Sequence, residues 1–441
     1  MISPCNNRVS AEADTAGLQI QPCRNASSEY DQLMTKHIAI IATLDTKGPE
    51  AAFMAGMVRE RGHLPIVIDV GAFTASSKAD FSNNTVAEQA GCSLEMLVRT
   101  GARDTVINTM GQGARRVLLA LLKQGKLDGA IGMGGNQGTA IAAMALRSLP
   151  LGFPKFLLST VASGNMRPYI GNADIGVMFS VADLLGGPNP VSRSVMSNAV
   201  AALVGMVERG EPISPAARGR TIALTALGNT EKAANRIHEQ LCQRGFQVIT
   251  FHASGAGGSA MEELMESGIF SGVVDLTPHE LSEEVVGAGA YIPVRPGRLA
   301  AAGRMGIPQV VSTGGLEYLC FGPKESIPTR LRKRKTYFHN PNNANVKVSR
   351  TEMMQIGTVM AERLNTATGP VAVLVPTKGW SVYGSKGGPL YDPKGNMLLL
   401  QALKKHLKPS IPFREIDLHI NDQTFADICV ETLIGLVQER E

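Results

Sequence analysis

Short apolar segments alternate with amphipathic helical stretches along most of the chain, and the apolar segments tend to end in polar or glycine-rich turns. In the first half, this pattern predicts strands at 38–44, 65–69, 129–133, 155–160 and 174–179. In the second half, it predicts strands at 221–227, 246–251, 272–276, 308–312, 335–338 and 371–375. Because strands that alternate with helices need crossover connections, the pattern predicts an α/β fold with mostly parallel sheets and helices on both faces.

The two halves of the chain repeat one another. The segment IAIIATLDTKGPEAAFMAGMVRERGHLPIVIDVGAF begins at residue 38, and a segment of the same pattern, IALTALGNTEKAANRIHEQLCQRGFQVITFHASGAG, begins at residue 222. Two more pairs follow in the same order: LDGAIGMGG with FSGVVDLTP, and LGFPKFLLST with MGIPQVVST. We therefore predict two similar domains at 37–209 and 216–441, joined by the linker RGEPISP.

Composition narrows the class of protein. The 441 residues suggest two or three domains, and the 5% aromatic content argues against a carbohydrate groove or a nucleic-acid stacking platform. The net charge of +5 comes partly from the cluster at 330–335, which we interpret as a solvated loop, with an anion or nucleic-acid patch as the alternative.

Cysteine spacing and hydropathy indicate the compartment. The six cysteines form no C-x-x-C pair and have no histidine at metal-ligand spacing, which argues against a zinc site or disulfide framework and favours a reducing cytoplasm. No run of 18 apolar residues occurs, so we expect neither a secreted nor a membrane protein. Residues 1–36 are polar and predict a disordered leader, or an upstream extension of a chain that starts at Met34.

The most informative segment is DGAIGMGGNQGT at 128–139, where an apolar run enters a glycine-rich turn before a helical stretch. Glycine lets successive N–H groups point the same way, and a helix N-terminus adds partial positive charge, so the turn favours an anion. We predict a phosphate cradle made by Gly134, Gly135, Asn136, Gln137, Gly138 and Thr139. The alternative is a strand-to-helix turn without a ligand, since the motif is neither a full G-x-G-x-x-G nor a Walker loop.

A second phosphate-contacting loop is predicted at LDTKG, where the first strand ends. Asp45 and Thr46 are expected to cap the following helix, and Lys47 supplies a mobile positive charge. The alternative is a capped helix with a surface lysine. The carboxyl ends of parallel strands share one edge of the sheet, so both loops are expected on the same edge.

Other polar groups could complete this site. Ser163 and Gly164 follow the fourth strand and could hold a phosphate or ribose, and Arg103 precedes a helical stretch that could bring it to the site. Asp174 and Asp183 could bind Mg²⁺ through water or cap a helix.

The second half carries Leu-Thr-Pro-His-Glu at 276–280 in place of the GGNQGT turn, and its own glycine-rich turn follows His252 and Ser254. These two side chains, beside backbone donors, are candidates for an acyl or phosphoryl site. The alternative is a histidine that is packed and hydrogen-bonded within the fold. Polar groups around 279, 339 and 419 also follow predicted strands.

Five motifs in order resemble one known family: LDTKG, DGAIGMGGNQGT, STVASGNMRPYIGNADI, FHASGAGGSAME and HIND. They are similar to the ATP-binding domain family whose best-known member is the inhibitory domain of the tomato mosaic virus resistance protein. The resemblance covers about residues 37 to 438 and implies two Rossmann-like domains, a homodimer, and ATP in the first domain. It also implies nucleotide contacts at Asp45, Thr46, Lys47, Arg103, Gly135, Asn136, Gln137 and Gly138.

These observations leave several functions open. The leading hypothesis is a cytoplasmic, homodimeric protein that binds ATP, with Mg²⁺ as a candidate companion ion. If it is an enzyme, an ATP-dependent or phosphoryl-transfer step on a small metabolite in a cleft between the domains is expected. The first alternative is a nucleotide-responsive regulatory module without turnover. The second is a sugar-phosphate isomerase or hydrolase. The sequence predicts no nucleic-acid or membrane partner.

Overall fold

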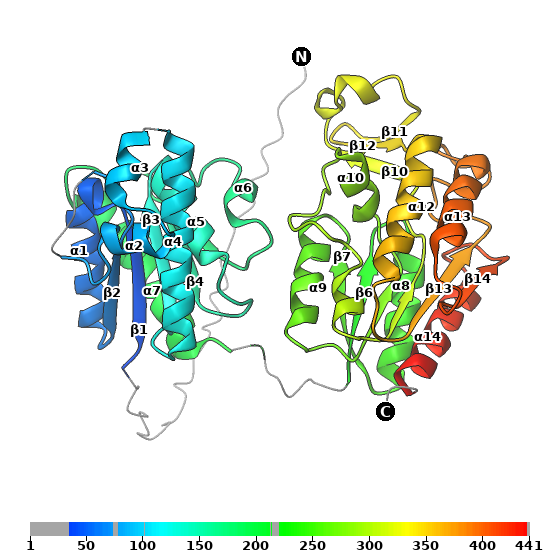
Figure 1. Ribbon diagram of the computed structural model, residues 1–441, viewed down its shortest axis with the longest axis horizontal. Coiled ribbons are helices and arrows are strands. Elements are labelled where there is room, and N and C mark those ends of the chain that lie inside the picture. Colours follow the sequence, from blue (N-terminus) through cyan, green and yellow to red (C-terminus); the bar gives the residue numbers. More distant parts are fainter. Residues whose placement is uncertain (1–34, 74–77, 101, 212, 214–219, 439–441) are drawn as a thin grey trace, which may run out of the picture. The chain divides into compact units, whose positions relative to one another are not determined.

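The computed structural model describes residues 35–73, 78–100, 102–211, 213 and 220–438 (Figure 1). Nearly all of the leader predicted at 1–36 and part of the predicted linker lie outside the described residues. The described chain contains two parallel sheets flanked by helices, which confirms the predicted α/β class with two domains.

The first domain contains a five-stranded sheet with the order β2-β1-β3-β4-β5, and all of its described strand pairs are parallel. Its strands are β1 (His37–Ala42), β2 (Leu64–Asp69), β3 (Gly129–Gly134), β4 (Lys155–Ser159) and β5 (Gly176–Phe179). Its helices are α1 (Leu44–Glu60), α2 (Asn83–Gln89), α3 (Leu94–Thr100), α4 (Arg103–Lys123), α5 (Asn136–Leu146), α6 (Arg167–Ile170) and α7 (Pro190–Arg209).

Strand β1 explains why both faces of this sheet are covered. Its apolar residues alternate between two cores: Ala39 and Ile41 pack with α2, α4 and α5, whereas Ile38 and Ile40 pack with α1 and α7. A strand buried on both faces has to be apolar at successive positions, which is the continuous run seen in the sequence.

Helix α7 is the one described helix whose length and composition alone would let it cross a membrane. Its Met196, Val200 and Leu203 are buried in the same core as α1 and the first sheet. Packing against the sheet therefore accounts for the apolar residues on the buried face of α7.

The second domain is built on a six-stranded parallel sheet with the order β14-β13-β9-β8-β6-β7. Its strands are β6 (Thr221–Ala226), β7 (Gln247–His252), β8 (Gly272–Asp275), β9 (Gln309–Val311), β13 (Val371–Pro376) and β14 (Phe413–Ile416). Its helices are α8 (Glu231–Gln243), α9 (Ala256–Glu266), α10 (Glu280–Val286), α11 (Ala301–Arg304), α12 (Arg350–Leu364), α13 (Pro393–His406) and α14 (Gln423–Gln438). Helices α8 and α14 share one core on this sheet, while α9 and α11 share another.

The strand orders explain the internal repeat. Read from β7, the second sheet runs β7-β6-β8-β9-β13-β14, so its first strand in the chain lies between the second and the third, as in the first sheet. The matched sequence pairs fall on equivalent strands: the pair at 127 and 270 on β3 and β8, and the pair at 151 and 305 on β4 and β9.

A small antiparallel sheet, β10-β12-β11, is inserted between β9 and α12. Its strands are β10 (Tyr318–Phe321), β11 (Thr336–Asn340) and β12 (Asn343–Lys347), and two short 3₁₀ helices, η2 (Lys324–Ser326) and η3 (Thr329–Leu331), lie between β10 and β11. The sequence predicted a strand at 335–338, and the structure places it in this small sheet. The pattern missed β10, β12 and β14; in β12 (NANVK) and β14 (FREI), polar residues interrupt the apolar run that marked the other strands.

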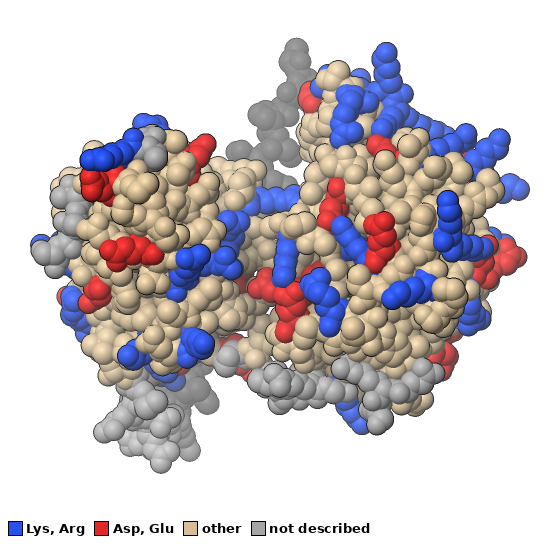
Figure 2. All heavy atoms as spheres, in the orientation of Figure 1, with Lys and Arg blue, Asp and Glu red and all other residues tan. Residues whose placement is uncertain are grey.

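The basic cluster of the sequence lies on the surface around η3, where Figure 2 shows blue side chains over this part of the second domain. Arg332 donates from Nε to the carbonyl of Ile327 at 2.9 Å, and Arg330 donates to the carbonyl of Val286 at 3.1 Å. Arg334 pairs with Glu352. Arg330, Arg332 and Lys333 are exposed, as the interpretation of a solvated loop expects, whereas Arg334 is partly buried in its ion pair.

Candidate functional site

The two predicted loops of the first domain meet at the centre of its sheet. Strands β1 and β3 are neighbours, and the chain leaves β1 toward β2 on one side but leaves β3 toward β4 on the other. Helices α1 and α5, which make these connections, pack in different cores on opposite faces. Parallel sheets bind ligands beyond the carboxyl ends of their strands at such a reversal of strand order. The LDTKG and GGNQGT loops both lie there.

Contacts between the loops are close. A Cβ built on Gly138 would lie 3.9 Å from Oγ1 of Thr43, the residue that immediately precedes the LDTKG loop. The structure therefore brings together two of the predicted phosphate-contacting loops.

The GGNQGT turn forms the beginning of a helix. Strand β3 ends at Gly134, and α5 begins at Asn136. Thr139 is fully buried, and its hydroxyl lies 3.2 Å from the Gly134 carbonyl and 2.7 Å from Oγ of Ser159. Thr139 therefore uses its side chain to tie α5 to β4 within the fold, whereas Asn136 and Gln137 are exposed.

The two adjacent glycines have different surroundings. A Cβ on Gly134 would lie 2.8 Å from the Cα of Gly138, so the fold itself requires glycine there. A Cβ on Gly135 would meet only Oγ1 of Thr160, at 3.7 Å, and its backbone φ of −78° is open to any residue. Protein packing therefore leaves room in front of Gly135, the space that a ligand approaching the backbone needs.

Helix α1 begins earlier than expected, and this corrects the predicted caps. The helix starts at Leu44, and its N-cap is Thr43, which makes no side-chain cap hydrogen bond. Asp45 and Thr46 lie inside the first turn: Oδ2 of Asp45 accepts from the amide of Phe73 at 3.2 Å, and Oγ1 of Thr46 lies 3.1 Å from Oγ1 of Thr43. Lys47 has non-helical dihedral angles (φ −125°, ψ 20°), so residues 44–46 form a separate turn before the main part of α1, and the Asp45 carboxylate tethers the segment after β2.

Lys47 is a largely buried cation in this loop. Only 8% of the residue is exposed, and its Nζ lies 4.0 Å from Oδ1 of Asp183, a carboxylate that is itself exposed. One turn further along α1, Oε1 of Glu50 accepts from the amide of Gly187 at 2.9 Å. The second oxygen, Oε2, is buried without a hydrogen-bond partner among the described residues.

The other residues predicted to contact the nucleotide lie at the start of a helix or in the turn after a strand. Arg103 is exposed at the start of α4, and Ser163 and Gly164 are exposed in the turn after β4. Oδ1 of Asn136 accepts from the hydroxyl of Tyr169 at 2.8 Å, which ties the glycine-rich turn to α6.

The two candidate Mg²⁺ ligands are separated. Asp183 follows β5 and lies beside Lys47, as described above. Asp174 precedes β5, pairs with the buried Lys155 at 2.6 Å and accepts from the amide of Gly152 at 2.7 Å. Because it lies before β5 rather than after it, Asp174 belongs to the opposite edge of the sheet.

The glycine-rich turn of the second domain is filled by the protein's own carboxylate. The amides of Gly255 and Gly258 donate to Oε1 of Glu280 at 2.8 and 3.0 Å. Oε2 of Glu280 accepts from Nε of Arg298 at 2.6 Å. The backbone donors that the sequence offered to an acyl or phosphoryl group are thus used within this domain.

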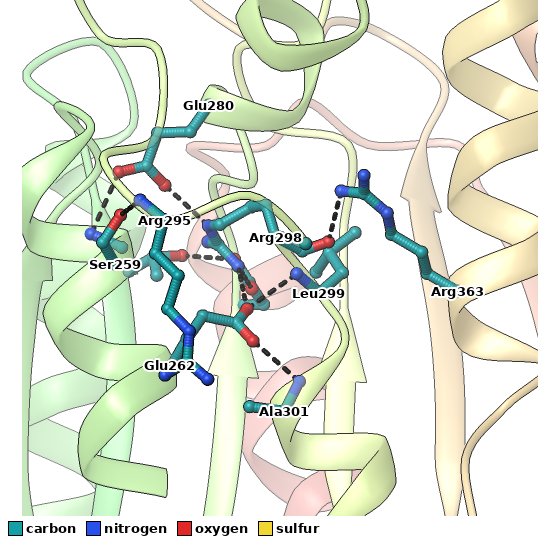
Figure 3. Close-up of polar contacts among 12 residues, drawn as sticks. Ser259, Glu262, Glu280, Arg295, Arg298, Leu299, Ala301 and Arg363 are labelled. Carbon is teal, nitrogen blue, oxygen red and sulfur yellow. Dashed lines mark hydrogen bonds and ion pairs between the residues drawn. The ribbon is translucent and has the colours of Figure 1, made fainter. Parts of the chain in front are cut away.

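Arg298 is the centre of a buried network (Figure 3). It also pairs with Asp275 through two hydrogen bonds of 2.6 and 2.8 Å and with Glu262 at 3.2 Å. Burial raises the pKa of Glu262, although Arg298 and the amides of Leu299 and Ala301 act in the other direction. Arg298, Glu262 and Asp275 were not identified from the sequence, because a network assembled from separate segments leaves no local pattern.

A polar pocket of about 210 Å³ lies at the equivalent edge of the second sheet. His252 contributes to its wall, whereas Ser254 donates only weakly to the His252 carbonyl, at 3.4 Å. The other residues that line the pocket are Leu227, Gly228, Asn229, Tyr291, Tyr318, Cys320, His339, Asn343, Asn345 and Tyr383.

Three buried groups lie together beside this pocket, and Cys320, which lines the pocket, is one of them; the other two are His279 and Glu283. Nδ1 of His279 lies 2.7 Å from the carbonyl oxygen of Gly315, and Nε2 lies 3.1 Å from Oε1 of Glu283. Burial alone would lower the pKa of His279, but the Cys320 sulfur and the Glu283 carboxylate raise it well above its ordinary value. His279 follows a predicted strand and was a candidate from the sequence, whereas Glu283 and Cys320 were not, because Cys320 lies in a distant segment and only the fold brings it to the other two.

Family comparisons agree with this architecture. Residues 36–212 match the N-terminal domain of an uncharacterised protein family, UPF0261, and residues 219–437 match its C-terminal domain. A Clostridium tetani protein of this family is 38% identical over 92% of this chain and all of its own length. A Rhizobium meliloti member is 36% identical over 90% of this chain and 98% of its own.

A plant relative confirms one part of the resemblance noted in the sequence, the similarity to a tomato mosaic virus resistance protein. The ToMV resistance protein Tm-1 of Solanum lycopersicum is 32% identical over 93% of this chain, which corresponds to 55% of the tomato protein. The models of both UPF0261 domains match this chain and together span nearly all of its described residues. The chain therefore belongs to the UPF0261 family.

Proposed function

We propose that the first domain binds ATP at the carboxyl ends of β1 and β3, between the LDTKG loop and the GGNQGT turn. The observation that carries this proposal is that both loops lie at the reversal of strand order of one parallel sheet. That position is where open parallel sheets bind nucleotides and other ligands.

Charge and backbone geometry support an anionic ligand. The N-terminus of α5 and its adjoining glycines offer main-chain N–H groups and partial positive charge. Lys47 adds a full charge from the facing loop. The open space at Gly135 lets phosphate oxygens approach the backbone directly.

Further parts of the proposal rest on the family resemblance and on cysteine usage. The family resemblance favours ATP over another phosphate compound and a homodimeric state. Cysteine usage favours a cytoplasmic location. Mg²⁺, if it accompanies the nucleotide, has Asp183 as the nearer of the two candidate carboxylates.

Calorimetric titration of the full chain with ATP, ADP and a sugar phosphate, each with and without Mg²⁺, tests the proposal. We expect ATP to bind more tightly than the sugar phosphate. We also expect Lys47→Met and Gly135→Ala to weaken ATP binding at least about tenfold, because they remove the cation and fill the space at the backbone.

Lys126→Met is the matched control. Lys126 is an exposed lysine of the same domain that precedes β3, so it lies at the opposite edge of the sheet. Its replacement should leave ATP affinity unchanged. Equal affinity in wild type, Lys47→Met and Gly135→Ala would remove this site assignment, and a preference for the sugar phosphate would favour a metabolite enzyme.

Turnover is a separate measurement. Release of ADP or phosphate from ATP in the presence of candidate metabolites would favour a phosphoryl-transfer enzyme. Tight binding without turnover would favour a nucleotide-responsive regulatory module.

A further inference from the structure

We propose that His279, Glu283 and Cys320 of the second domain bind one transition-metal ion of the zinc class, which keeps an open coordination position toward the polar pocket. This site is independent of nucleotide binding in the first domain. Its three ligands come from the segment after β8 and from β10.

The potential ligand atoms converge on one point. The imidazole nitrogen, the carboxylate oxygen and the thiol sulfur all lie within 4.8 Å of one another, and all three residues are buried. His279 and Glu283 are four residues apart at the start of α10, which places both on one face of the helix. Cys320 approaches that face from the small antiparallel sheet.

The three ligand types suit zinc. Zn²⁺ accepts imidazole nitrogen, carboxylate oxygen and thiolate sulfur, and Mg²⁺ or Ca²⁺ would not favour a sulfur ligand. Catalytic zinc sites use three protein ligands and leave the fourth position for water or substrate. Three converging ligands beside a pocket match that arrangement.

Outer hydrogen bonds already orient the ligands. The carbonyl oxygen of Gly315 can only accept, so Nδ1 of His279 must carry a proton, and Nε2 faces the carboxylate. Oε1 of Glu283 accepts from the amide of Cys320 at 2.6 Å, and Oε2 accepts from the amide of Tyr291. Metal-binding histidines characteristically donate their second ring N–H to a carbonyl or carboxylate in this way.

A thiol–imidazole catalytic pair explains the geometry less well. In such a pair, one ring nitrogen takes the thiol proton while a third group holds the other nitrogen. Here Gly315 occupies Nδ1, and the Nε2 side of the ring faces both Glu283 and the Cys320 thiol, so this nitrogen is not reserved for the thiol alone. A shared ion on the Nε2 side accommodates all three groups.

The pocket supplies an independent sign of a ligand. Cys320 lines it, so an ion held by this sulfur would lie at its wall. Asn229 is only 6% exposed and also lines the pocket, yet its Oδ1 has no hydrogen-bond partner in the described part of the chain. Oδ1 of Asn343, another lining residue, is likewise buried without a hydrogen-bond partner among the described residues. Buried acceptors of this kind call for a donor, so a small molecule with hydroxyl or amine groups fits the pocket.

Zinc content of the full-length chain tests the site. The reduced protein is loaded with zinc chloride, passed through metal-free buffer by gel filtration, and analysed by atomic emission. We expect about one retained zinc ion per chain in the wild type and near zero in Cys320→Ser and His279→Gln. Circular dichroism establishes that each variant is folded.

Cys242→Ser is the matched control, because Cys242 is exposed on α8 with its Sγ 3.8 Å from Nδ1 of His238 and could bind zinc adventitiously. Its zinc content should equal that of the wild type. Near-zero zinc in the wild type, or zinc lost in Cys242→Ser but kept in Cys320→Ser, overturns the proposal.

Two measurements on the wild type need no variant. Cobalt(II) added to the chain should give tetrahedral visible bands together with a sulfur-to-cobalt charge-transfer band. Zinc should protect Cys320 from alkylation of the folded chain, whereas Cys242 remains reactive. The chain is unfolded and digested only afterwards, so that peptide mapping shows which cysteines were alkylated. Octahedral cobalt bands without the charge-transfer band, or equal alkylation of Cys320 with and without zinc, would contradict metal binding by this thiol.

Discussion

Arg298 and Asp275 form a two-pronged ion pair inside the second domain, with Nη1 and Nη2 lying 2.6 and 2.8 Å from the two carboxylate oxygens. Both residues are at most 2% exposed. The same guanidinium also donates hydrogen bonds to Glu262 and Glu280. Glu280 in turn accepts from the amides of Gly255 and Gly258 in the glycine-rich turn. One buried cation therefore organises the edge of the sheet at which the polar pocket lies.

Replacing this cation should strongly destabilise the second domain. Arg298→Met leaves buried carboxylates without a counter-charge, so we expect the free energy of unfolding to fall by about 3–5 kcal/mol. The chain's single tryptophan, Trp380, is buried in this domain, so its fluorescence during denaturant unfolding reports on the domain directly.

Arg304→Met provides the control for this prediction. Arg304 is half exposed and pairs with Glu266 at 2.9 Å. Loss of an exposed ion pair should cost at most about 1 kcal/mol. Similar losses in both variants would contradict a central role for Arg298.

The stability of the second domain should depend on acid through Glu352. Burial raises the pKa of this carboxyl, but hydrogen bonds from Arg334 at 2.6 and 2.9 Å and from Ser349 outweigh burial and lower the pKa below its ordinary 4.5. Since the folded pKa is the lower one, this contribution is fully present above pH 4.5 and is lost as the pH falls through the folded pKa.

Glu352→Gln should therefore destabilise the domain by about 1 kcal/mol at neutral pH, because it removes the charge that pairs with Arg334, while glutamine still supplies the capping-box acceptor of α12. The difference from wild type, followed by Trp380 fluorescence, should shrink below pH 4.5. A difference of constant size from neutral pH to about pH 3 would exclude this carboxylate as its source.

The sequence predicted the scaffold well because local patterns encode it. Continuous apolar runs identified β1 and β3, and the internal repeat identified the equivalence of β3 with β8, which the shared strand order now explains. The polar loops could be placed at one edge because parallel strands all end there.

The sequence predicted less where distant segments meet. Cysteine spacing argued against a zinc site, yet folding brings Cys320 to His279 and Glu283 from a strand that no periodicity revealed. Instead of capping α1, Asp45 accepts from the amide of Phe73 and Thr46 contacts Thr43, since α1 begins at Leu44 with Thr43 as its N-cap. Such features depend on tertiary contacts, which a linear pattern does not carry.

The two glycines of the cradle should respond differently to alanine. Gly134→Ala puts a methyl group 2.8 Å from the Cα of Gly138, and backbone cannot move aside as a flexible side chain can. We expect the first domain to lose about 1–3 kcal/mol of stability, measured by circular dichroism.

Gly135→Ala should leave stability within about 0.5 kcal/mol of the wild type, because the new methyl group meets only Thr160 Oγ1 at an ordinary contact distance. Comparison of the two variants therefore distinguishes a glycine that the fold requires from a glycine that leaves space for a ligand. A large loss of stability in Gly135→Ala would show that this glycine serves packing and would weaken its use as a probe of ATP binding.

Asp174 should matter for stability and not for nucleotide binding. Burial lowers the pKa of Lys155, and the hydrogen bond and charge of Asp174 oppose that effect. Asp174→Asn removes the counter-charge from a fully buried ammonium group, so we expect the first domain to lose about 1–3 kcal/mol. Because the first domain contains no tryptophan, circular dichroism should record this loss while Trp380 fluorescence keeps its midpoint.

The affinity for ATP in the presence of Mg²⁺ should stay unchanged in Asp174→Asn, since Asp174 precedes β5, whereas both loops follow their strands. A fall in Mg²⁺-dependent affinity without a loss of stability would instead identify Asp174 as a metal ligand.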